Sequence, residues 1–176
     1  MHPVGFVHVL CAVTALVLGV LIFAITKGTR LHAYLGHAYV VSMVGLNVTA
    51  LLIYRLIGGF GPFHVAAFIS LATLLYGYAA VWTRRPADRW LTIHYHAMSW
   101  SYVGLLAAAV SESIVRIDVM RQFISSRINF GIAVSVASGV VCIAGGWIIA
   151  KSERRVMSKL KPRGNARSDL NFQDES

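Results

Sequence analysis

Histidine side chains recur near the starts of long apolar runs in this chain, where imidazole rings can bind a metal or move a proton. The chain has seven histidines among its 176 residues. Six lie at or near the start of successive runs: His8 in the first, His32 and His37 in the second, His64 in the third, and His94 and His96 in the fourth. An ionisable side chain at membrane depth is costly, which makes each one a candidate functional residue. If successive runs cross a bilayer in alternate directions, the histidines of odd and even runs gather at opposite faces, which suggests passage of electrons, protons or ions across.

The elements that must position these residues are helices in a membrane. The chain is 57% hydrophobic and 13% charged, with a mean hydropathy of +0.66, which is typical of an integral membrane protein. Five segments are long enough to cross about 30 Å of hydrocarbon as helices; they are 4–26, 36–57, 62–83, 91–115 and 128–150. None alternates like a barrel strand. The sequence therefore predicts an all-α five-helix transmembrane bundle over 1–150, followed by a basic tail at 151–176 that is expected to be disordered.

Basic residues predict the orientation of these helices. The chain has 16 lysines and arginines. One side of the predicted membrane holds Lys27, Arg30, Arg84, Arg85, Arg89, Lys151, Arg154, Arg155, Lys159, Lys161, Arg163 and Arg167, and the other holds Arg55, Arg116, Arg121 and Arg127. The positive-inside rule places the N-terminus outside and the C-terminus in the cytoplasm, as in a multi-pass protein of the bacterial inner membrane. The net charge is thus explained without nucleic acid, and the tail is suited to contact with anionic lipid.

Helical phase separates the histidines into two kinds. At 100° per residue, one stripe of the second run contains His32, Gly36, Tyr39, Met43 and Asn47, and one stripe of the fourth contains His94, Met98, Ser101, Tyr102 and Glu112. His37 and His96 lie off these stripes. Because buried polar groups seek partners inside a bundle, we expect His32 and His94 to form an inner site, with His37 and His96 as substitutes.

Pairs of histidines on different helices are suited to a b-type haem, whose iron takes an imidazole from each side. The outer pair would be His8 and His64, and the inner pair His32 and His94. In topology alone, this arrangement resembles the cytochrome b561 type of diheme four-helix core, in which alternate helices pair their histidines. That resemblance implies electron transfer across the membrane, with a quinone or a redox partner protein at one end.

A second resemblance rests on local motifs. K-G-x-x-x-H-x-x-x-G-x-x-Y begins at Lys27, G-P-F-H begins at Gly61, and H-x-x-x-M-x-x-S-Y begins at His94. These are similar to a bacterial family of uncharacterised, predicted multi-span membrane proteins, a domain of unknown function. The resemblance implies that His8, His32, His64 and His94 are the functional histidines, and it supplies no activity.

Two other classes of function stay open. Glu112 is expected at the level of His8 and His64, and two histidines with one carboxylate are a plausible Zn²⁺ or Fe²⁺ site. A water on such a metal can attack an ester or amide, so a metal-dependent membrane hydrolase is one alternative. An ion pair with Arg116, four residues on, explains Glu112 equally well. A non-catalytic accessory subunit is the other alternative, and the sequence leaves open whether the protein is an enzyme.

Overall fold

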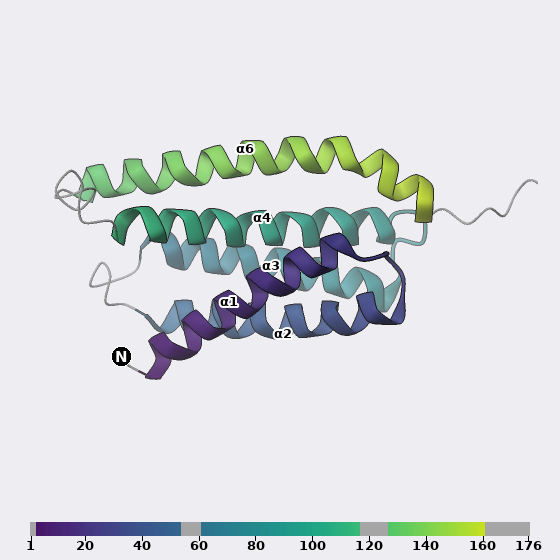
Figure 1. Ribbon diagram of the computed structural model, residues 1–176, viewed down its shortest axis with the longest axis horizontal. Helices are drawn as coiled ribbons and strands as arrows, with labels where there is room; N and C mark the ends of the chain where they lie inside the picture. Colours follow the sequence, from purple (N-terminus) through teal and green to yellow (C-terminus); the bar gives the residue numbers. More distant parts are fainter. Residues whose placement is uncertain (1–2, 54–60, 117–126, 161–176) are drawn as a thin grey trace, which may run out of the picture.

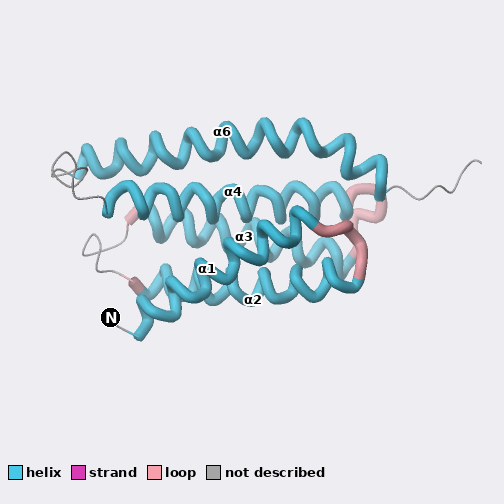
Figure 2. The backbone as a smooth tube through the Cα atoms, viewed as in Figure 1, coloured by secondary structure: helices cyan, strands magenta, loops and turns pink. Residues whose placement is uncertain are grey.

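Helices account for nearly all of the chain that the computed structural model describes, which is residues 3–53, 61–116 and 127–160. They are α1 (Pro3–Ala24), α2 (Arg30–Leu52), α3 (Pro62–Thr83), α4 (Trp90–Arg116) and α6 (Arg127–Leu160). No strand occurs within these ranges (Figure 2). The predicted all-α architecture is therefore confirmed for this part of the chain.

The helices lie side by side in an elongated bundle (Figure 1). Helix α1 packs against α2, α2 against α3, and α3 against α4, while α1 also touches α4. Helix α6 packs on α4. The short connections 25–29 and 84–89 lie at one end of the bundle, together with the C-terminal end of α6 (Figure 2). Sequential helices thus run antiparallel, as short connections favour, and α4 occupies the centre.

Four of the described helices are long and apolar enough to cross a membrane: α1, α2, α3 over His64–Thr83, and α6 over Asn129–Ser158. The protein is thus a multi-pass membrane protein. Helix α4 falls outside this group because its sequence is interrupted by polar residues, of which Ser99, Ser101 and Ser111 are buried.

Helix α2 begins earlier than the apolar pattern indicated. It starts at Arg30 rather than at 36, because the Thr29 hydroxyl accepts a hydrogen bond from the His32 backbone N–H at 3.1 Å and caps the helix. Thr29 at this position is a favoured N-cap residue. Just before it, the Lys27 ammonium donates to the Phe23 carbonyl at 3.0 Å and closes the end of α1. His32 therefore lies inside the first turn of α2, at a defined orientation.

Helix α6 continues to Leu160, well beyond the expected end at 150. Residues 151–160 are helical, which differs from the disorder expected there. Lysine, arginine, glutamate and methionine are good helix formers, so the loss of apolar character at Lys151 ends the hydrophobic segment without ending the helix. Residues 161–176 lie outside the described part of the chain, and the division of the chain at 150 stays a prediction.

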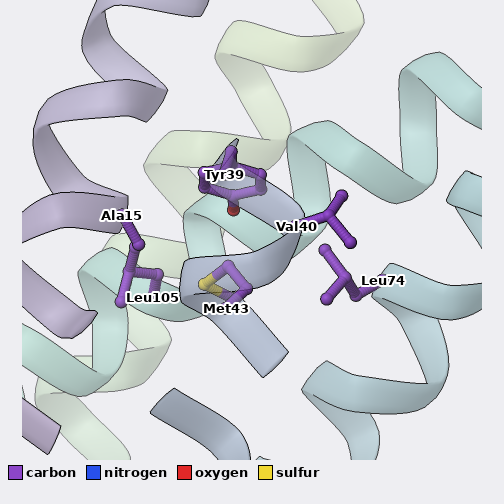
Figure 3. Close-up of a cluster of buried hydrophobic side chains, with 6 residues drawn as sticks. All are labelled: Ala15, Tyr39, Val40, Met43, Leu74 and Leu105. Carbon is purple, nitrogen blue, oxygen red and sulfur yellow. The ribbon is translucent and has the colours of Figure 1, made fainter. Parts of the chain in front are cut away.

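The core of the bundle is a cluster contributed by four helices (Figure 3). Its buried members are Ala15, Tyr39, Val40, Met43, Leu74 and Leu105. Close approach of α1 to α4 depends on Gly19, because a Cβ there would lie 2.0 Å from Cε2 of Tyr102. The Tyr102 hydroxyl donates to the Leu16 carbonyl at 3.2 Å beside it. The ring of Tyr102 thus fits over the glycine and joins these two helices.

Candidate functional site

His94 is held in one orientation by the backbone of a neighbouring helix. Its Nδ1 lies 3.0 Å from the Gly77 carbonyl oxygen of α3. A carbonyl oxygen only accepts, so Nδ1 carries the proton and donates it, which leaves Nε2 with a free lone pair. Histidines that bind metals are commonly fixed in this way, by a hydrogen bond from the ring nitrogen that does not bind. His94 therefore has the tautomer that a ligand to a metal needs.

Gly77 makes that contact possible. A Cβ at this position would lie 2.6 Å from the Ala97 Cβ of α4, which is too close for two carbon atoms. Both Gly77 and Ala97 are buried. The absence of a side chain lets α3 approach α4 closely enough for the Gly77 carbonyl to reach His94.

His32 lies at the same end of the bundle, in the first turn of α2. Its Nδ1 is buried, and within the described residues that atom has no hydrogen-bond partner. Buried polar atoms without partners are uncommon in folded proteins, so each one needs an explanation such as a bound group. His32 and His94 thus both lie near the start of their helices, at the same end of the bundle (Figure 2).

Deeper in the bundle, a hydrogen bond joins the same two helices. The Tyr39 hydroxyl of α2 lies 2.9 Å from Ser101 Oγ of α4, and Ser101 in turn donates to the Met98 carbonyl at 2.9 Å. Tyr39 and Ser101 are both buried. Gly36 lies between His32 and Tyr39 on α2, and a Cβ there would meet nothing within 4 Å. There is therefore open space beside α2 between the histidine and the tyrosine.

The two substitute histidines are engaged elsewhere. His37 is exposed, its Nδ1 lies near the Ala33 carbonyl of its own helix, and its ring packs edge-on against Tyr78 with centroids 5.8 Å apart. His96 Nε2 lies 3.0 Å from Glu153 Oε1 of α6. Both substitutes thus have contacts of their own, and the choice of His32 and His94 as the inner pair stays a prediction.

The pairing of His96 with Glu153 belongs to a polar seam that sequence reasoning missed. Next to it, the Tyr95 hydroxyl lies 2.8 Å from Ser152 Oγ and donates to the Ile149 carbonyl at 3.2 Å. The available signal was Glu153 itself, which is the one acidic residue in the sequence of α6. This seam joins residues 149–153 of α6 to α4, directly after His94 on α4.

The outer histidines each have a hydrogen-bond contact within the bundle. His8 Nδ1 lies 3.0 Å from the Thr49 hydroxyl, and His64 is buried with Nδ1 accepting from the Gly61 backbone N–H at 3.2 Å. Glu112 is half-buried on α4. Among the described residues, no group of three or more His, Cys, Asp or Glu side chains is placed to hold a metal ion. The metal site predicted on His8, His64 and Glu112 therefore stays a prediction, without support from the described residues.

Fold and site together define a multi-pass helical membrane protein with polar side chains buried between its helices. The family described as "Predicted membrane protein (DUF2306)" matches residues 5–152, and the chain belongs to this family. No curated protein and no solved structure matches the chain. The resemblance to uncharacterised membrane proteins is thus confirmed, while the comparisons give no support to the likeness to cytochrome b561.

Proposed function

We propose that this membrane protein is a b-type cytochrome-like redox protein whose inner haem is bound by His32 and His94. The observation that carries the proposal is the hydrogen bond from His94 Nδ1 to the Gly77 carbonyl, which leaves Nε2 as a ligand atom. At the same end of the bundle, His32 has a buried ring nitrogen without a partner among the described residues. Two imidazoles from different helices are a common axial set for haem.

The residues around the pair fit such a group in two respects. A carbonyl behind a ligating histidine fixes the ring and raises its basicity, and Gly77 supplies that carbonyl. Gly36, one turn after His32, has open space where a side chain would stand, which suits the approach of a flat macrocycle to the backbone. When bound, the haem supplies one-electron chemistry, while the protein orients it, limits water and tunes its potential.

An outer haem on His8 and His64 is the second half of the proposal. His8 Nδ1 faces the Thr49 hydroxyl, which itself donates to the Gly45 carbonyl at 2.7 Å, so His8 Nε2 is left with a lone pair. His64 already uses Nδ1 as an acceptor at the start of α3. Electrons would pass between a cytoplasmic or quinone donor and an acceptor on the outer side.

The proposed topology has five spans, with α4 as the fourth, an outer N-terminus and a cytoplasmic C-terminus in the bacterial inner membrane. Helix α4 runs beside α3 and α6 (Figure 1). Its polar groups bond to neighbouring helices, as when Ser111 Oγ meets Ser138 Oγ of α6 at 3.0 Å. Polar groups satisfied inside a bundle are compatible with a span.

Exposed basic side chains support this orientation. Lys151, Arg154 and Arg155 are exposed on the extension of α6, and Lys151 Nζ lies 4.8 Å from the centroid of the Trp147 ring. Tryptophan at this position is typical of a membrane interface, and the adjacent cations suit anionic lipid headgroups.

A fluorescent protein fused after Ser176 should be fluorescent, and alkaline phosphatase fused there should be inactive. Active phosphatase would contradict the orientation.

The proposed function is tested by the colour of the purified protein. Protein expressed in haem-replete cells should give a reduced-minus-oxidised difference spectrum of the b type, with haem in stoichiometric amount. Absence of haem absorbance would overturn the proposal. Zinc or iron measured in that same haem-free sample would favour a metal-dependent enzyme, and a sample with neither would favour an accessory subunit.

A further inference from the structure

The hydrogen bonds between helices fall into an inner and an outer group, which are clearest along α2. On the inner side, Tyr39 of α2 bonds to Ser101 of α4. On the outer side, Asn47 Nδ2 donates to Ser70 Oγ of α3 at 3.3 Å, and the Thr49 hydroxyl meets His8 of α1. Helix α2 therefore contacts α1, α3 and α4 through polar groups.

An apolar layer separates these two groups. It consists of Ala15, Met43, Leu74 and Leu105, one residue from each of α1 to α4, with exposed fractions of 0%, 1%, 0% and 5%. They belong to one contiguous cluster (Figure 3). We call these four residues the apolar layer.

The order along each helix shows that the layer lies between the polar groups rather than beside them. On α2, Met43 falls midway between Tyr39 and Asn47, which are eight residues and about 12 Å apart along a helix axis. On α3, Leu74 lies between Ser70 and the carbonyl-bearing Gly77.

The same holds for the central helix. On α4, Leu105 lies between Ser101, which bonds to Tyr39, and Ser111, which bonds to Ser138. Three helices thus carry the sequence polar, apolar, polar at matching levels.

Protons move between hydrogen-bonding groups and water, and an apolar, close-packed region offers neither. We propose that the apolar layer is a proton seal, which divides the interior of the bundle into an inner and an outer polar half-network. Each half-network exchanges protons with its own side of the membrane, and the layer keeps protons from crossing. This inference does not depend on what His32 and His94 bind.

Leu74 is the residue at which the seal is best tested. The protein is placed in vesicles of phosphatidylethanolamine and phosphatidylglycerol that contain a pH-sensitive dye, with potassium and valinomycin to dissipate charge. After an acid pulse, vesicles with the unmodified protein should acidify no faster than empty vesicles. Leu74→Ser should raise the rate of acidification inside the vesicles several-fold. The shorter side chain leaves space for water, and its hydroxyl with that water would connect Ser70 to Tyr39. Alanine is unsuitable, since an apolar cavity stays dry.

The matched control is Leu75→Ser, which makes the same change on the exposed side of α3, where Leu75 is 48% exposed. It should leave the rate unchanged. A double variant, Leu74→Ser with Asn47→Leu, should lose the leak because the outer half-network is then interrupted.

Proton entry through the unmodified protein would overturn the seal. Equal rates for inserted Leu74→Ser and Leu75→Ser proteins would overturn it as well. Should Leu74→Ser fail to insert, Met43→Ser against Val41→Ser repeats the comparison on α2, where Val41 is 71% exposed. Since the measurement needs no haem, a colourless protein that seals in this way would reject the proposed redox function and retain the seal.

Discussion

A His94→Ala variant is expected to lose the inner haem while the helical bundle stays inserted in the membrane. The substitution removes one axial imidazole, and the iron of a b-type haem depends on such a ligand. The loss of folding stability is expected to be small compared with the loss of haem binding. His94 is half-buried, and the bond lost to the Gly77 carbonyl contributes about 1 kcal/mol, as hydrogen bonds typically do. His32→Ala should have the same effect on haem content.

The matched control is His37→Ala, which changes an exposed histidine on the same helix as His32. Its haem content should equal that of the unmodified protein. The measurement is haem per polypeptide in purified membranes, with the difference spectrum as the second readout. Imidazole added to a His94→Gly variant should restore part of the spectrum. An unchanged spectrum in His94→Ala would reject the assignment, and the same measurement on His96→Ala would then show whether His96 takes its place.

Helical periodicity predicted which face of α2 is buried. Tyr39, Met43 and Asn47, four residues apart in turn, are all nearly inaccessible, whereas His37 is exposed. This succeeded because a polar stripe within an apolar helix is expected to face the neighbouring helices rather than lipid. Length and hydropathy likewise predicted the five helices that the described residues form.

Contacts between helices were beyond the sequence. His8, His64 and Glu112 were predicted to share a level, but a level does not say which helices are adjacent or how far apart their facing side chains lie. Among their contacts, His8 Nδ1 lies against the Thr49 hydroxyl and His64 Nδ1 accepts from the Gly61 backbone N–H. The sequence alone indicates neither contact.

The extension of α6 was missed for a different reason. Hydropathy ends at Lys151, but helix formation does not require apolar residues. Ser152 and Glu153 then bond to Tyr95 and His96. A polar helical segment held by partners distant in sequence has no periodic apolar pattern. Its sequence alone therefore indicates a solvated tail.

Gly77→Ala is expected to damage both the packing and the inner site. The added methyl group would stand 2.6 Å from the Ala97 Cβ, and neither atom can rotate away because both are attached directly to helix backbones. Helices α3 and α4 must therefore separate, and overpacking of this kind costs about 1–3 kcal/mol. The same movement withdraws the Gly77 carbonyl from His94 Nδ1, so the ring loses its fixed tautomer and orientation. We expect a lower melting temperature together with a lower haem content or a shifted midpoint potential.

Ala97→Gly in the same chain should restore much of both properties, because it removes the methyl group that the new side chain meets. The matched control is Gly104→Ala on α4, where a Cβ would meet nothing within 4 Å and where alanine should be neutral or slightly stabilising. Melting temperature in detergent and the difference spectrum are measured on all four proteins. A Gly77→Ala variant that melts like Gly104→Ala would contradict the close approach of α3 and α4. A variant that melts early but keeps an unaltered spectrum and potential would make Gly77 a packing residue alone, and the carbonyl could then no longer be the group that positions His94.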